Sequence, residues 1–253
     1  MIIDIYIYTM NFSSLDFFVY SSHKTSTQSL LHILKVNNYK AAHCHIINDL
    51  HIGLKLDHPV QHEQFKQFLV DYKIQNNKKI KILSCVRNPK DRLISSFFQS
   101  FHNGEMYFKI SKENETTITL KNADELTGIC KELIKTKSLP RHMESLDDLS
   151  TIHNINILEL LEKRKDYYYL DHDLFELYVL DFNRIIDKDI CLNYLNNILS
   201  IELKTFEMDN LSKNKSYYHK YKNVKNQIGK TLDSIIENQY HKFYFTAFET
   251  FNG

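Results

Sequence analysis

Residues 79–98 read KIKILSCVRNPKDRLISSFF, and this stretch decides the fold class. Its first eight residues, 79–86, form a short apolar run of the length expected for a buried strand in a parallel sheet. The strand ends at Arg87-Asn88-Pro89, and Pro89 suits the first turn of a helix. The helix would place its apolar side chains on one face, namely Leu93, Ile94, Phe97, Phe98 and Phe101. A strand that leads into an amphipathic helix is typical of a β–α–β protein.

The same alternation of strand and helix occurs twice upstream. An apolar run at 15–20 closes with Ser21-Ser22 and is followed by a helical pattern over 26–35. A second short strand at 41–47 precedes an amphipathic helix at 61–74. Three alternations in the first hundred residues predict an α/β protein. We expect a three-layer, P-loop-like fold with a central parallel sheet flanked by helices.

The rest of the chain is expected to complete this sheet and to add a helical cap. The pattern predicts a strand at 174–180, a loop or hairpin at 103–120, and helices at 123–136, 155–165, 188–199 and 228–240. We expect one domain over 1–253, in which 103–170 form an insertion or cap and 210–253 a basic, aromatic C-terminal segment.

Composition limits the classes of partner. The 253 residues carry 32 Lys and Arg against 31 Asp and Glu, so there is no global field to attract nucleic acid, and any anion site must be local. The four cysteines, at 44, 85, 130 and 191, have neither a disulfide framework nor metal-ligand spacing. No run approaches the roughly 20 apolar residues of a membrane span. We expect a cytoplasmic protein with no transmembrane segment and no bound metal.

Polar residues between the first strand and its helix form the first candidate site. His23-Lys24-Thr25-Ser26-Thr27-Gln28-Ser29 lie where a helix begins. Backbone N–H groups and the helix dipole favour an anion there, Lys24 adds a charge, and the hydroxyls add donors. The segment also fits an ordinary helix cap. It lacks the glycines of a Walker-type loop, which disfavours a nucleoside triphosphatase.

The second candidate site follows the strand at 79–86. Arg87 leaves that strand, and Ser95 lies about two helical turns further on. A guanidinium fork with a hydroxyl suits a phosphate monoester. Taken alone, Arg87 and Asp91 also fit a simple ion pair at the start of a helix. Together, however, the two sites lie at the carboxyl ends of predicted parallel strands, where open α/β sheets bind ligands.

These two motifs resemble those of sulfotransferases that use 3′-phosphoadenosine 5′-phosphosulfate. The similarity is carried by Lys-Thr-Ser-Thr-Gln-Ser-Leu at 24–30 and Val-Arg-Asn-Pro-Lys-Asp-Arg-Leu-Ile-Ser-Ser-Phe at 86–97. The resemblance implies that Lys24, Thr25, Ser26, Thr27, Gln28 and Ser29 hold the 5′-phosphosulfate. It implies that Arg87 and Ser95 hold the 3′-phosphate.

Within that family the chain is similar to the carbohydrate branch, such as the uronyl 2-O-sulfotransferases. In those enzymes a His-x-His strand follows the first helix, which matches His43-Cys44-His45 and implies that His45 is the general base. Strand alternation places His43 and His45 on one face and Cys44 on the other, which argues against a zinc site formed by these three residues and His51. His43 would be a positioning residue, and Lys24 would stabilise the departing oxygen.

The C-terminal segment resembles that of bacterial capsular polysaccharide synthesis proteins with an Asn-Lys-Trp-Tyr-Ser signature. The matching residues here are Asn214-Lys215-Ser216-Tyr217-Tyr218, and Lys215 is the expected cofactor contact. The resemblances together imply transfer of a sulfuryl group to a carbohydrate hydroxyl, as in capsule or surface polysaccharide synthesis. Two alternatives stay open: a P-loop, kinase-like enzyme that uses ATP, and a noncatalytic nucleotide or glycan binder.

Overall fold

A computed structural model describes residues 12–22, 25–45, 47, 50, 59–103, 122–135, 145–207, 218–228, 242, 243, 246, 247 and 249. They belong to two compact units. The first contains the described residues of 1–86 and 143–209, and the second those of 87–142 and 210–249.

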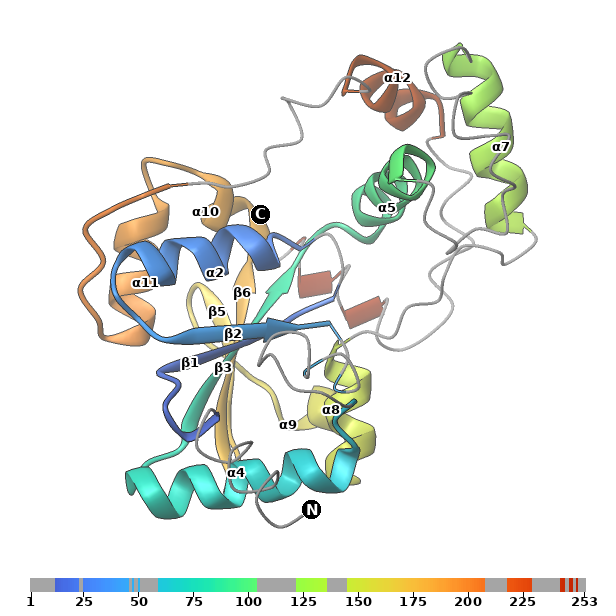
Figure 1. Cartoon of the computed structure of the whole chain (residues 1–253). Coiled ribbons are helices and arrows are strands. Elements are labelled where there is room, and N and C mark those ends of the chain that lie inside the picture. Colours follow the sequence, from blue (N-terminus) through green and yellow to red (C-terminus); the bar gives the residue numbers. More distant parts are fainter. Residues whose placement is uncertain are drawn as a thin grey trace. The chain divides into compact units, whose positions relative to one another are not determined.

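The first unit is built on one six-stranded sheet (Figure 1). Its strands, in spatial order, are β2 (Ala41–Cys44), β1 (Phe17–Tyr20), β3 (Ile80–Val86), β6 (Phe175–Asp181), β5 (Tyr167–Asp171) and β4 (Glu162–Lys163). The first four strands are parallel, and β5 and β4 are antiparallel to their neighbours. The predicted α/β class is therefore confirmed, and the sheet is mixed where we expected a parallel one.

The antiparallel edge has a simple cause. Only three residues, 172–174, separate β5 from β6, and His172 N–H donates to the Phe175 carbonyl at 3.0 Å across this turn. A parallel neighbour would need a crossover of a dozen or more residues, so this short connection forces a hairpin. Tyr167–Leu170, which the sequence assigned to an insertion, thereby belong to the central sheet.

Helices cover both faces of the sheet (Figure 1). One face carries α2 (Thr27–Val36), α10 (Phe182–Ile186) and α11 (Cys191–Leu199). The other face carries α4 (His62–Asn76) and α8 (Ser145–His153), with the short α9 (Ile157–Leu160) beside α8. The segment expected to form a helix over 155–165 is helical only to Leu160, because Glu162 and Lys163 pair with β5.

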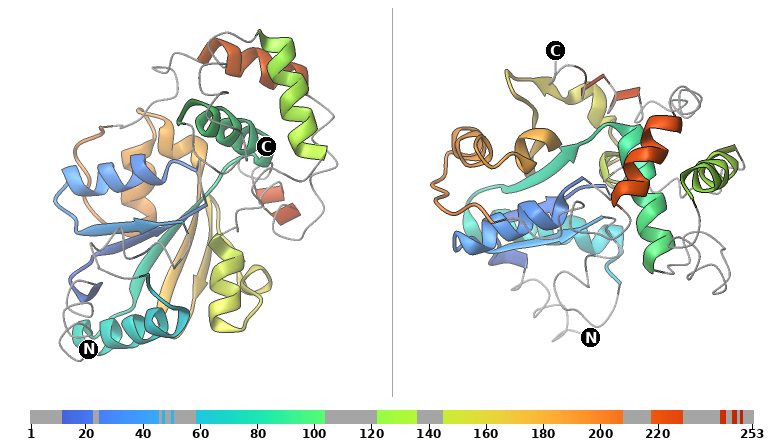
Figure 2. Two further views of the ribbon diagram at one scale, coloured as in Figure 1. Left: turned by 45° about the vertical axis from the view of Figure 1, so that its right-hand side comes forward. Right: turned by 90° about the horizontal axis from the view of Figure 1, so that it is seen from above.

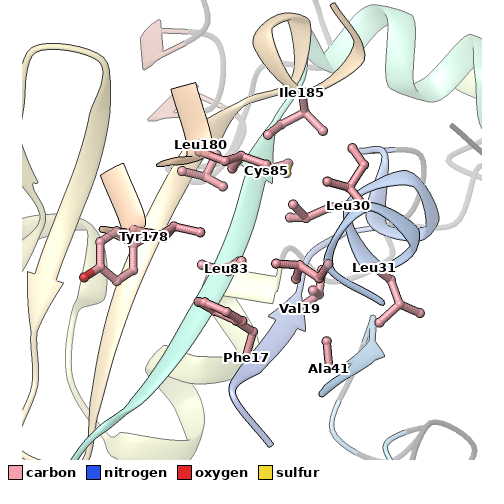
Figure 3. Close-up of a cluster of buried hydrophobic side chains, with 14 of the residues drawn as sticks. Phe17, Val19, Leu30, Leu31, Ala41, Leu83, Cys85, Tyr178, Leu180 and Ile185 are labelled. Atoms are coloured by element: carbon pink, nitrogen blue, oxygen red, sulfur yellow. The ribbon is translucent and has the colours of Figure 1, made fainter. Parts of the chain in front are cut away.

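Strand alternation divides the core between the two faces. Phe17 and Val19 of β1 belong to one buried cluster with Leu30 of α2, and Figure 3 shows Leu83 of β3 close to Phe17 and Val19. Phe18 points the other way, and its ring centroid lies 5.7 Å from that of Phe65 in α4. Burial on both faces explains why the strands read as continuous apolar runs.

The second unit contains three described helices, α5 (Pro89–Asn103), α7 (Ala123–Lys135) and α12 (Tyr218–Ile228), drawn in Figure 2. Their apolar faces meet in a small cluster of buried residues, namely Ile94, Phe97, Phe98, Leu126, Cys130, Val224 and Ile228. The predicted helix at 228–240 lies outside the described residues except for Ile228, and α12 precedes it.

Candidate functional site: the loop after strand β1

A network of buried hydroxyls forms the loop after β1. Ser21 Oγ accepts a hydrogen bond of 2.9 Å from Cys85 N–H on β3, and it lies 2.6 Å from Thr25 Oγ1. Thr25 Oγ1 donates to the Ser22 carbonyl at 2.5 Å, so the Ser21 hydroxyl must be the donor to Thr25. Ser22 Oγ accepts from Ser145 N–H of α8 at 3.1 Å. Hydrogen bonds to buried groups of β3 and α8 therefore hold the loop in place.

This network changes the expected role of Thr25. Its hydroxyl has one proton, and that proton is used in the bond to the Ser22 carbonyl. Thr25 is buried, with 1% of its surface exposed. In this structure the Thr25 side chain shapes the loop, and its role as a ligand contact stays a prediction.

The N-terminus of α2 has the features of an anion site. Ser26, the residue before the helix, has left-handed backbone angles (φ 61°, ψ 25°), and its side chain makes no capping hydrogen bond. Thr27 begins the helix, and its Oγ1 is buried without a hydrogen-bond partner among the described residues. A buried hydroxyl without a partner is costly, and an anion or a water at this helix end would satisfy it.

His45 lies just beyond the end of β2, and its ring is held by this same loop. His45 Nδ1 lies 2.7 Å from the carbonyl oxygen of Ser21. A carbonyl only accepts, so Nδ1 must carry a proton, and in the neutral ring the lone pair is therefore on Nε2. The bond therefore selects the tautomer in which Nε2 is the basic nitrogen, which is what a general base requires.

His43 has a different environment from His45. Gln28 Nε2 lies 2.7 Å from His43 Nε2, and because an amide nitrogen only donates, the lone pair of His43 is occupied by this bond. Burial, aided by His45 and Lys35, lowers the pKa of His43 to about 4. His43 is therefore a neutral acceptor near pH 7, and it suits positioning better than proton transfer.

The two histidine rings are neighbours, as strand alternation predicts. Their centroids are 5.8 Å apart and their planes meet at 77°. Cys44 between them is buried in the opposite direction, within the core. The expected His-x-His pair thus exists as a pair, next to the loop that opens α2.

Strand order brings the ends of β1 and β3 together. β1 pairs directly with β3 on one side and with β2 on the other, and the connecting helices α2 and α4 cover opposite faces. The chain direction across the sheet therefore reverses at β1, and open α/β sheets bind ligands outside the carboxyl ends of strands at such a point. Ser21 lies at this edge, and Val86 ends β3 immediately before Arg87.

The second motif lies in the second unit. Arg87 Nη2 donates to the hydroxyl of Tyr221 in α12 at 3.3 Å, and burial of the guanidinium lowers the pKa of Arg87. Lys225, one turn after Tyr221, pairs with Asp91 at 2.7 Å. Asp91 therefore pairs with Lys225, and it also interacts electrostatically with Arg87. Ser95 is half-buried on α5.

Three expected site residues cannot be placed. His23 and Lys24 of the loop, and Lys215 of the C-terminal segment, lie outside the described residues. Within the described part of the loop, Ser26 is half-buried, Gln28 is exposed and Ser29 is buried. Gln28 reaches His43, which its position in the motif did not predict.

The sequence-based prediction did not include two buried serines that lie beside the loop after β1. Ser84 Oγ lies 3.2 Å from Ser145 Oγ, and both residues are fully buried. Helix α8, which begins at Ser145, was not predicted. Its buried residues Leu146, Leu149 and Ile152 recur every three positions, and this periodicity could have indicated a helix.

Two classes of feature are absent from the part of the chain that the structure describes. There, no group of three or more His, Cys, Asp or Glu side chains is arranged to hold a metal ion. No helix in the described ranges is long and apolar enough to cross a membrane.

The structure shows an α/β protein in which Thr27, at the N-terminus of α2, has a buried hydroxyl with no hydrogen-bond partner among the described residues, and His45 contacts the loop before that helix through Nδ1. The chain matches no protein-family model and no solved structure. Among curated proteins it is 27% identical over 179 residues to the CRISPR-associated endoribonuclease Cas13a of Leptotrichia shahii. This similarity covers 68% of the chain and 12% of that much longer protein, so it does not assign the chain to a family.

Proposed function

We propose that the chain is a sulfotransferase that transfers a sulfuryl group from 3′-phosphoadenosine 5′-phosphosulfate to a carbohydrate hydroxyl. The observation that carries the proposal is the 2.7 Å contact between His45 Nδ1 and the Ser21 carbonyl. It connects the histidine expected to act as base to the loop expected to bind the sulfated end of the donor. The finer fold class, P-loop-like, and a role in surface polysaccharide synthesis are parts of the same proposal.

His45 supplies the base in this proposal. A sugar hydroxyl is a weak nucleophile, and its oxygen needs to lose a proton as it attacks sulfur. His45 Nε2 accepts that proton, while Nδ1 keeps its bond to Ser21 and stabilises the imidazolium. The new bond joins the acceptor oxygen to sulfur, and the bond from sulfur to the 5′-phosphate oxygen breaks. The products are a sulfate ester and adenosine 3′,5′-bisphosphate.

The N-terminus of α2 is the expected site of the 5′-phosphosulfate. The backbone N–H groups of its first turn and the Thr27 hydroxyl would donate to oxygens of the anion. Buried Thr27 Oγ1 makes no hydrogen bond to any other described residue, and such a ligand would satisfy it. The backbone of Thr25 and Ser26 and the side chain of Lys24 complete this site in the proposal.

Arg87 and Ser95 are the expected ligands of the 3′-phosphate. Tyr221 adds a phenol that contacts the Arg87 guanidinium, and burial raises the pKa of that phenol, so it stays a neutral hydrogen-bond donor. A guanidinium that is withdrawn from water binds a phosphate dianion more strongly than an exposed one. Lys215 would add a further cation.

The test is transfer of radiolabelled sulfate from the donor to a panel of acceptor glycans. We expect the wild-type chain to label at least one glycan in the absence of magnesium. His45→Ala should lower the transfer rate by roughly 100-fold or more, the range typical of a lost general base. His32→Ala is the matched control, because His32 lies on the exposed side of α2 and contacts Glu207.

Two outcomes would contradict the proposal. One is that the protein binds the donor but transfers no label to any glycan in the panel. The other is equal transfer by the wild type and by His45→Ala, which would remove the base from the mechanism.

A further inference from the structure

A buried carboxylate, Asp148, joins the segments on either side of the contact between His45 and Ser21. Asp148 belongs to the first turn of α8, and only 4% of its surface is exposed. Its Oδ2 accepts a hydrogen bond from the hydroxyl of Tyr20, at the end of β1. The same oxygen accepts from Ile47 N–H at 3.0 Å.

The residues that donate to Asp148 are close in sequence to Ser21 and His45. Tyr20 immediately precedes Ser21, whose carbonyl holds His45, and Ile47 follows His45 by two residues. Ser145, also in α8, donates its N–H to Ser22 on the other side of Ser21. Helix α8 therefore holds both neighbours of Ser21 and the backbone just beyond His45.

An imidazole lies beside the other oxygen of Asp148. His62, the first residue of α4, has its Nε2 3.4 Å from Asp148 Oδ1 and is partly exposed. A buried carboxylate is costly unless donors satisfy it, and here a phenol and a backbone N–H donate to it while an imidazole lies close by. Because these three groups come from different segments, their relative positions depend on Asp148.

We infer that Asp148 is a positioning residue for His45, which acts by fixing the two segments whose separation sets the bond from His45 Nδ1 to the Ser21 carbonyl. This inference rests on the proposed function for its catalytic consequence only. Its structural part, control of the His45 tautomer, holds whatever reaction the protein catalyses.

The experiment uses imidazole nitrogen chemical shifts of the full chain, assigned with His45→Gln, at a pH where the rings are neutral. The wild type should report His45 with its proton on Nδ1. Asp148→Asn should convert His45 to a mixture of tautomers, because a neutral amide oxygen accepts more weakly from Tyr20 and from Ile47 N–H than a charged carboxylate oxygen does. Asp147→Asn removes a carboxylate from the same helical turn and should leave the His45 signals unchanged.

A second variant guards against loss of folding. Tyr20→Phe removes one donor to Asp148 and keeps the ring, so it should shift the His45 signals in the same direction with a smaller amplitude. Circular dichroism then identifies any unfolded variant. If Asp148→Asn and Tyr20→Phe both fold and leave His45 on the Nδ1 tautomer, the inference is overturned.

Transfer assays separate this inference from the proposed function. If the wild type transfers sulfate, Asp148→Asn should lower kcat by about 10- to 100-fold with an unchanged KM for the donor, as expected when a reacting group is misplaced. An unchanged kcat would overturn the positioning role. If the tautomer depends on Asp148 but no transfer occurs, the proposed function fails and the positioning of His45 stands.

Discussion

Gln28 of helix α2 donates a hydrogen bond to His43 of strand β2, with 2.7 Å between the two Nε2 atoms. This contact joins α2, whose N-terminus is the candidate anion site, to β2, which contains His43 and ends just before His45. It also fixes His43 as an acceptor, because its lone pair is already engaged.

Gln28→Ala should raise the pKa of His43 from its value of about 4 towards the ordinary value. A hydrogen bond to the neutral ring favours the neutral form, so its loss makes protonation easier. A bond worth about 1 kcal/mol corresponds to roughly a fivefold change in the acid dissociation constant. A titration followed by NMR measures this. Gln67→Ala, which removes a similar surface amide bonded to Asp71, is the control and should leave His43 unchanged.

Two half-buried histidines should make the protein sensitive to acid. Burial lowers the pKa of both His43 and His153 to about 4. A histidine with a lowered folded-state pKa takes up its proton more readily in the unfolded chain. Stability is therefore complete above the unfolded value of about 6.5 and decreases as the pH falls towards 4.

We expect the melting temperature to fall by several degrees between pH 7 and pH 5. His153→Phe keeps an aromatic ring next to Phe175, whose centroid is 5.1 Å from that of His153, and it should make the fall smaller. Calorimetric melting over this range measures both. An identical pH dependence in the variant and the wild type would show that His153 is not responsible.

Much of the first unit can be predicted from sequence, because strands that are buried on both faces have short, continuous apolar sequences. Phe17–Tyr20 and Ile80–Val86 were recognisable in this way. The antiparallel hairpin was missed because its evidence is the length of one turn, at 172–174, and that turn reads as polar loop. Periodicity alone does not reveal strand direction.

The candidate site was only partly predictable, for a related reason. The helix start at 24–29, which includes Thr27, can be read from a local pattern, whereas His45 was indicated by the resemblance to the uronyl 2-O-sulfotransferases. The bonds that give these residues their chemistry join positions far apart in sequence, such as Ile47 to Asp148. Spacing in the sequence carries no information on such contacts.

Removing the charge of Asp181 should stabilise the folded protein. This buried residue ends β6 and caps α10 by accepting a bond of 2.9 Å from Asn183 N–H. Burial raises the pKa of Asp181, so ionisation costs stability as the pH rises above the unfolded value of 3.8. Asp181→Asn keeps a capping oxygen without the charge and should raise the melting temperature at pH 7.

Asp181→Ala is the matched comparison. It removes both the charge and the capping oxygen, and loss of a cap typically costs about 0.5–2 kcal/mol. The alanine variant should therefore melt below the asparagine variant. If the asparagine variant melts below the wild type at pH 7, the charge of Asp181 is stabilising and our interpretation is wrong.

The cysteines should be unreactive in the folded protein. All four are buried and unpaired as disulfides. Burial raises the pKa of Cys130 and Cys191 to about 12 and that of Cys85 further, so little of the reactive thiolate exists at pH 8. A chromogenic disulfide reagent should label none of the four thiols in buffer and all of them in guanidinium. Rapid labelling without denaturant would contradict the described burial.

The most direct test of the proposed function is calorimetric titration with adenosine 3′,5′-bisphosphate in buffer containing EDTA. We predict binding without magnesium, with most of the affinity lost in Arg87→Ala and an unchanged affinity in Arg164→Ala, whose exposed guanidinium contacts only Glu162 and the face of Tyr169 among the described residues. ATP with magnesium should bind more weakly than the bisphosphate. Tighter binding of magnesium ATP, or bisphosphate affinity that does not depend on Arg87, would contradict the account.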